Sequence, residues 1–169
     1  MVTTRHGFTL VEILVVTIVL GLLAAIVLPE FSNASQMARA AMLRDNLRLM
    51  RSQTMVFKAQ HNNVSPGYPD GDVEQNPTAE ALVAQITKPS NAEGETAELG
   101  TVGYDYGPYM RQVPENPING KTSVRVLGDG AEFPTEPQDS DGWIYQPSTL
   151  LFKSDCTGED ENGTPYFEY

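Results

Sequence analysis

Cysteine and histidine are scarce in this chain of 169 residues, which holds one cysteine, Cys156, and two histidines, His6 and His61. A single cysteine excludes a disulfide within the chain. The scarcity of both residue types also excludes a His-rich or Cys-rich metal site, and it leaves no supported Cys–His nucleophile pair. We therefore expect Cys156 to be a spectator thiol.

Sequence motifs of common enzymes are also absent. The chain has no Gly-rich phosphate loop, no Gly-x-Ser-x-Gly elbow and no His-Glu-x-x-His helix. Acidic residues are plentiful, but they are scattered over expected loops, where chance pairs are inevitable and identify no acid/base site. The sequence therefore predicts a protein that is not an enzyme.

Positive charge is scarce in the second part of the chain. Residues 61–169 carry five Lys or Arg against 19 Asp or Glu, a net charge of −14, whereas residues 8–60 carry five against three. Such a region repels nucleic-acid phosphates, so we expect no nucleic-acid partner. The carboxylates either attract cations or a basic partner, or they keep an exported domain soluble, and we favour solubility.

What the chain does have is a long apolar run over residues 8–28, in which Glu12 is the only ionisable side chain. As a helix, these 21 residues reach roughly 31 Å, about the thickness of one hydrocarbon core. A charged group inside such a span costs a few kcal/mol, so it is usually paired, neutralised or functional. Glu12 is therefore the first candidate functional residue.

The residues around Glu12 resemble the N-terminus of type IV prepilins and type II secretion pseudopilins. A short basic leader, residues 1–7, ends in Gly7 and precedes Phe8-Thr9-Leu10-Val11-Glu12. The resemblance implies that a prepilin peptidase cuts between Gly7 and Phe8 and methylates the new amine of Phe8. It also implies that Glu12 acts in filament assembly and that Pro29 bends the helix.

The order of these features also differs from that of a secretory signal, which has a shorter apolar stretch followed by its cleavage site. Here Gly7 precedes the run, so cleavage would leave the helix on the product with a new amine at its start. In a bundle of staggered copies, Glu12 could meet the Phe8 ammonium of a neighbour, which would offset much of the desolvation of both charges. The alternative is an uncleaved signal anchor, with Glu12 protonated or reaching the interface.

Beyond Pro29 the apolar residues become periodic, at alternating intervals of three and four, which predicts one face of a helix that continues to about Gln60. A kink is expected near Leu28 because proline lacks the N–H that helix continuation needs. We expect the apolar face to cover the domain's own sheet, and a docking surface for other subunits is the alternative. The face consists of Ala40, Leu43, Leu47, Met50, Thr54 and Phe57, flanked by Arg44, Arg48, Arg51 and Lys58.

Turn-forming residues divide the rest of the chain. Residues 61–71 predict a loop, and Asn76 and Pro77 predict the N-cap and first position of a short helix. Residues 123–127 predict a strand, and residues 142–145 and 150–153 predict a hairpin. The residues assigned to the core between sheet and long helix are Trp143, Tyr145, Leu151 and Phe152.

Four segments follow from these patterns: a leader over 1–7, a transmembrane and assembly helix over 8–29, its amphipathic continuation over 30–60, and an acidic globular domain over 61–169. The fold class is α+β, with a long N-terminal helix packed on a small antiparallel β-sheet, as the pilin resemblance implies. A weaker likeness, in Gly107-Pro108-Tyr109-Met110 and Gly142-Trp143-Ile144-Tyr145, is to major pseudopilins of type II secretion.

Those pseudopilins often hold calcium in an acidic C-terminal loop, so the likeness implies a calcium site. Calcium takes six to eight oxygen ligands, which acidic loops supply. The two acidic stretches, residues 139–141 and 155–162, do not fit the EF-hand spacing. The alternative is that both are ordinary solvated turns. The candidate ligands are Asp139, Asp141, Asp155 and Asp160.

The leading functional interpretation is a structural subunit of a type II secretion pseudopilus. It would cross the inner membrane once, carry its domain in the periplasm, and assemble with copies of itself, other pseudopilins and an inner-membrane platform. The alternatives are a surface type IV pilin for adhesion, motility or DNA uptake, and an anchored periplasmic binding domain that forms no filament.

Overall fold

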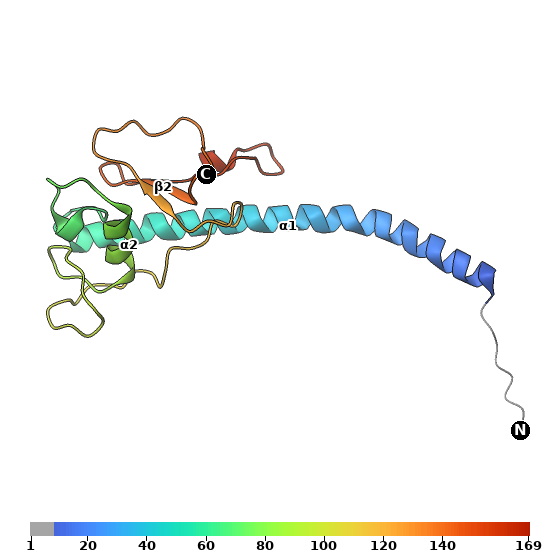
Figure 1. Ribbon diagram of the computed structural model, residues 1–169, viewed down its shortest axis with the longest axis horizontal. Helices are drawn as coiled ribbons and strands as arrows, with labels where there is room; N and C mark the ends of the chain where they lie inside the picture. The colour runs from blue at the N-terminus through green and yellow to red at the C-terminus, as the bar shows by residue number, and fades with distance from the viewer. Residues whose placement is uncertain (1–8) are drawn as a thin grey trace, which may run out of the picture. The chain divides into compact units, whose positions relative to one another are not determined.

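A computed structural model describes the backbone of residues 9–169 and the side chains of residues 9–25 and 34–169. The chain forms two compact units, Met1–Ala38 and Arg39–Tyr169, each of which contains part of the first helix. The elements, drawn in Figure 1, are α1 (Leu10–Gln60), η1 (Pro69–Gly71), α2 (Ala79–Thr87), β1 (Val124–Val126), β2 (Trp143–Gln146), β3 (Leu151–Ser154) and η2 (Tyr166–Glu168).

The predicted long helix is confirmed, since α1 ends at Gln60 as the periodic spacing indicated. All six residues of the predicted face are buried, with at most 2% of any of them exposed. Four of them, Ala40, Leu43, Leu47 and Met50, belong to one core cluster with the strands and loops of the same unit, so the face covers the domain's own core. The kink at Pro29 stays a prediction.

The sheet differs from the prediction in one respect. β2 and β3 form the predicted antiparallel hairpin, in which Tyr145 lies opposite Phe152. β1, however, pairs in parallel with β2, with Val124 opposite Trp143. Parallel pairing requires the chain to return to the end of the sheet at which β1 begins, and segment 127–142 is long enough for this crossover. The expected antiparallel sheet is therefore wrong in detail, because the sheet is mixed, while the α+β class is confirmed.

The core lies between this sheet and the second part of α1 (Figure 1). Trp143 and Tyr145 have no exposed surface and Phe152 is 1% exposed, whereas Leu151, also predicted to be core, is only half-buried. The indole N–H of Trp143 donates to the Pro114 carbonyl at 2.9 Å, so its one polar atom has a partner within the core.

The short helix α2 begins two residues later than predicted. Its N-cap is Thr78, whose side-chain oxygen accepts the N–H of Ala81 at 3.1 Å. Threonine and asparagine both serve as N-caps, and Thr78 lies two residues after Asn76. The assignment of Asn76 as the cap and Pro77 as the first helical residue is therefore wrong.

His61, predicted to begin a loop, is a buried residue at the end of α1. Its Nδ1 lies 2.7 Å from the Phe57 carbonyl oxygen, which can only accept, so Nδ1–H donates and Nε2 accepts from the Ser90 hydroxyl at 2.8 Å. The ring stacks on Phe57 and meets the edges of Tyr106 and Tyr109. Burial lowers the pKa of His61, although the hydrogen bond to Phe57 opposes the shift.

We expect the stability of the domain to fall as the pH is lowered below about 6.5, the ordinary pKa of histidine. Because the pKa of His61 is lowered in the folded chain, the unfolded chain binds the proton more readily. The stabilising contribution is present above about pH 6.5 and is lost as the pH falls through the folded value, by at most about 1.4 kcal/mol per pH unit. Thermal melting of the detergent-solubilised chain between pH 5 and 8 measures this slope, and an equally steep slope in His61→Gln would assign it to other groups.

Candidate functional site

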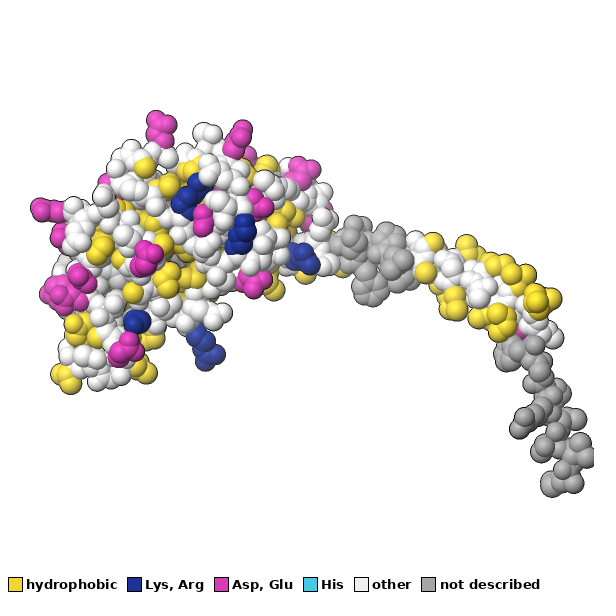
Figure 2. Space-filling model, in the orientation of Figure 1, with side chains coloured by type: hydrophobic (Ala, Val, Ile, Leu, Met, Phe, Trp, Pro, Cys, Tyr) yellow, Lys and Arg dark blue, Asp and Glu magenta, His cyan; other side chains and the backbone are white. Residues whose placement is uncertain are grey.

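The first turns of α1 carry apolar side chains on every side. The large apolar residues from Leu10 to Leu23 are each between 48% and 83% exposed, and Figure 2 shows many apolar side chains on the visible face of this helix. A helix that is apolar all round requires cover from lipid or from other helices. None of the described helices meets the combined length and hydropathy expected of a membrane span.

Glu12 closes a capping box at the start of this helix. Its Oε2 accepts the backbone N–H and the hydroxyl of Thr9, both at 2.8 Å, and Thr9 Oγ1 accepts the N–H of Glu12 at 3.2 Å. Sequence reasoning missed this role of Thr9, although the spacing Thr-x-x-Glu before an apolar run is its signal. Among the described residues no donor reaches Oε1 of Glu12, so the carboxylate retains an oxygen for a further partner.

The other predicted processing residues lie outside the described part of the chain. Gly7 and Phe8 precede the described backbone, and the side chain of Pro29 is also not described. Cleavage after Gly7, methylation of Phe8 and bending at Pro29 therefore stay predictions.

Asp155 is fully buried beneath the loop of residues 138–141. Its Oδ1 accepts the N–H of Gln138 at 2.7 Å, and its Oδ2 accepts the N–H groups of Ser140 and Asp141 and the Ser140 hydroxyl at 3.0 to 3.1 Å. The guanidinium of Arg125 lies 3.6 Å from Oδ1. Burial raises the pKa of Asp155, but these hydrogen bonds and the Arg125 charge outweigh burial and lower the pKa overall.

Asp139 and Asp141 flank the same buried carboxylate. The Asn119 amide donates to Asp139 Oδ1 at 2.9 Å and to the Asp141 carbonyl at 2.8 Å. Oδ2 of Asp141 accepts the Ser140 hydroxyl at 2.9 Å. The structure thus brings three of the four predicted calcium ligands into one region of the domain.

Asp160 belongs to a separate cluster against α1. Its Oδ2 accepts from the Arg44 guanidinium and from the Tyr169 hydroxyl, and its Oδ1 accepts the N–H groups of Asn162 and Thr164 at 2.9 and 3.0 Å. The hydrogen bond from Tyr169 is the largest of the effects that lower the pKa of Asp160 to about 2. This cluster fastens the end of the described chain to the long helix.

Comparisons with known proteins agree with the N-terminal motif and extend beyond it. The family described as the prokaryotic N-terminal methylation motif matches residues 3–28. Several relatives share the name "Type II secretion system core protein G". The protein from Pectobacterium carotovorum is 28% identical over 75% of this chain and 69% of its own length, and that from Vibrio cholerae is 28% identical over 74% and 73%. The chain thus carries the prepilin methylation motif and is similar to type II secretion core protein G over most of its length.

The similarity of the chain to these relatives is not confined to the first helix. The relative from Pseudomonas aeruginosa is 24% identical over 82% of this chain and 85% of its own length, which includes much of the globular domain. No solved structure matches the chain significantly.

The predicted calcium ligands are already engaged within the chain. Both oxygens of Asp155 and both oxygens of Asp160 receive N–H, O–H or guanidinium donors, so these carboxylates are held in place without an ion. The calcium site stays a prediction. In the described part of the chain, no group of three or more Asp, Glu, His or Cys is arranged to hold a metal ion.

We expect removal of calcium by a chelator to leave the melting temperature of the chain unchanged. An ion that binds only the folded state at 100 times its dissociation constant stabilises it by about 2.7 kcal/mol, which thermal melting would detect easily. The comparison is made with and without EDTA, and with magnesium added back as a control. A fall on chelation that calcium alone restores would show that the ion displaces the donors on Asp155 or Asp160.

Proposed function

We propose that the chain is a structural subunit of a type II secretion pseudopilus, which serves protein export by assembling into a filament. The observation that carries the proposal is the similarity to core protein G relatives over about three quarters of the chain. The fully apolar start of α1 and the carboxylate of Glu12 supply an assembly surface, because neither is covered within its own unit.

In this proposal a prepilin peptidase cuts between Gly7 and Phe8, and residues 8–29 hold the product in the inner membrane as a single pass. The domain then lies in the periplasm, and the partners are copies of the chain, other pseudopilins and an inner-membrane assembly platform. A second copy's Phe8 ammonium can bind the Oε1 of Glu12 while Thr9 keeps its contacts with Oε2. Pairing the two charges offsets the desolvation of each.

The first test is the intact mass of the chain purified from membranes of its own host. A chain that begins at N-methylated Phe8 supports processing, and a chain that retains residues 1–7 supports the signal-anchor alternative. Gly7→Val serves as the control, since the resemblance implies that the peptidase needs the glycine, and this variant should keep its leader.

The second test separates a pseudopilus from a surface pilus. Deletion of the chain should stop export of the host's secreted enzymes to the medium, and expression of the chain should restore export. Loss of surface filaments and motility with normal export would instead assign the chain to a type IV pilus.

A further inference from the structure

An apolar loop tip projects from the domain at residues 98–103. Leu99 is 82% exposed and Val102 is 96% exposed, more than any other large apolar residue of the domain. The tip is an ordered turn, because the Thr101 N–H donates to the Glu98 carbonyl at 3.2 Å and Lys88 pairs with the Glu98 carboxylate at 2.8 Å. Two neighbouring apolar side chains held in water on an ordered turn indicate a contact with another surface.

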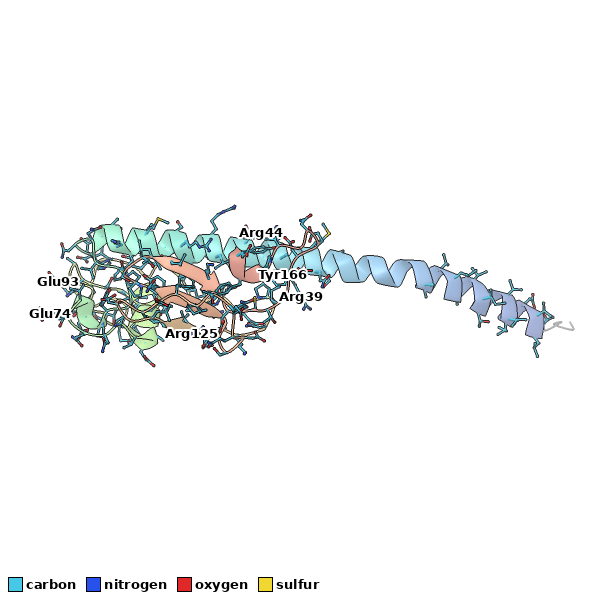
Figure 3. All side chains as sticks on the ribbon, turned by 90° about the horizontal axis from the view of Figure 1, so that it is seen from above. Arg39, Arg44, Glu74, Glu93, Arg125 and Tyr166 are labelled. Atoms are coloured by element: carbon cyan, nitrogen blue, oxygen red, sulfur yellow. The ribbon has the colours of Figure 1, made fainter. Side chains whose placement is uncertain are left out.

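A groove lies on the outer side of α1 in the same domain. Its volume is about 680 Å³, and its apolar lining includes Leu47, Met55, Val56 and Ala59. Met55 is 56% exposed and Val56 is 40% exposed. Figure 3 shows α1 along one edge of the domain, with most strands and loops on one side of it.

We propose that the loop tip of one copy docks into the α1 groove of the next copy. The tip and the groove are different surfaces of one molecule, and their contact is therefore heterologous, running head to tail from copy to copy. A contact of this kind makes an open helical filament when its rotation does not close. The inference rests on the proposed function and assigns the surfaces by which successive domains meet.

Charge favours this pairing over other contacts between copies. The loop tip is bordered by Glu93, Glu95 and Asp105, all exposed, while the groove is bordered by Arg48, whose side chain is 82% exposed and has only a 3.7 Å contact with Asp45. Residues 61–169 carry 19 acidic residues against five basic ones, and acidic side chains are scattered over the visible face of the domain (Figure 2), so two loop surfaces tend to repel one another. The basic edge of α1 is the surface that attracts an acidic tip.

The contact between tip and groove is small. A single loop tip in a groove buries far less than the roughly 1,200 Å² of a stable protein complex, so it would be weak between free domains. Copies anchored side by side by their first helices meet at a high effective concentration, and a weak contact is then sufficient. The tip and groove would therefore set the arrangement of domains rather than hold the filament by themselves.

Disulfide cross-linking in the full chain tests the contact. Val102→Cys and Met55→Cys place one thiol on the tip and one in the groove, and Cys156 is only 1% exposed, so the unmodified chain serves as a blank. Co-expression of the two variants in host membranes should give a cross-linked dimer under mild oxidation, and the double variant should give a ladder of multimers. Neither single variant should dimerise, because a heterologous contact does not bring identical positions together.

A matched control is Val73→Cys, an apolar position 55% exposed outside the tip, which should cross-link to Met55→Cys at least about tenfold less. Leu99→Asp should lower the yield of the cross-link between Val102→Cys and Met55→Cys by about tenfold or more, because burial of one branched side chain changes an association constant by that factor. Dimers from Val102→Cys alone, or filaments and export at normal levels without any cross-link, would overturn the contact and leave the proposed function standing. If the unmodified chain formed no filaments and its deletion left export unchanged, both the contact and the proposed function would be overturned.

Discussion

Replacing Glu12 with alanine is expected to leave processing at Gly7 intact and to reduce filament assembly by roughly a hundredfold. The variant removes the carboxylate that would meet a neighbour's Phe8 ammonium, and it leaves that charge unpaired among apolar helices. Loss of one partner from a buried ion pair costs about 3 kcal/mol or more, which is a factor of about a hundred. Intact mass measures the processing, and the yield of sheared filaments measures the assembly.

Two further variants separate pairing from helix capping. Thr9→Val removes the hydroxyl of the capping box but keeps the carboxylate, so it should cost about 1 kcal/mol, or roughly fivefold in assembly. Thr17→Ala removes a hydroxyl that bonds only to the Leu14 carbonyl, and it should assemble normally. Assembly of Glu12→Ala at the normal level would rule out the pairing, and a Thr9→Val defect as severe as that of Glu12→Ala would assign the role to the helix cap.

Asp155→Ala is expected to lower the melting temperature of the domain by roughly 10 °C, the largest effect on folding that we predict. The substitution removes the acceptor of the N–H groups of Gln138, Ser140 and Asp141 and leaves the Arg125 charge without its nearest carboxylate. Buried donors without an acceptor cost about 1 to 3 kcal/mol each when water cannot replace it. Thermal melting of the full chain in detergent measures the change.

The control for this substitution is Asp139→Ala, because Asp139 is exposed and its carboxylate accepts one hydrogen bond, from Asn119. Its melting temperature should stay within about 2 °C of the unmodified value. The lowered pKa of Asp155 also fixes the pH range of its contribution. The contribution is present above about pH 3.9 and is lost as the pH falls through the folded value. Equal effects of the two substitutions at neutral pH would contradict the central role of Asp155.

The sequence predicted the parts of the fold that depend on local periodicity. The buried face from Ala40 to Phe57 follows the 3.6-residue period of one helix, and the hairpin of β2 and β3 follows from two short strands around a turn. The parallel pairing of β1 was not predicted, because it depends on the path of segment 127–142, which has no periodic pattern.

The sequence identified Glu12 of the candidate site but not the hydrogen-bond partners of its carboxylates. Glu12 stood out because a charge in an apolar run is exceptional, and the capping partner Thr9 was missed although its signal is local. Asp155 and Asp160 were predicted as calcium ligands because the sequence alone does not show whether a carboxylate binds an ion or accepts hydrogen bonds from the chain. The donors that occupy them come from other parts of the chain, and Arg44 lies 116 residues from Asp160. Partners at that separation follow from the fold and not from spacing.

The arrangement of the core determines when during export the domain can fold. The buried face of α1 packs against residues from α2 to Tyr166, which in the proposed function are synthesised and cross the membrane after the helix does. Until those late residues arrive, an apolar helix face such as that of Leu43 and Leu47 stays open to proteases and to other nascent chains. The half-life of newly translocated chains should therefore depend on how quickly translocation delivers the last strand, and holdase chaperones of the export route are expected to bind the incomplete domain.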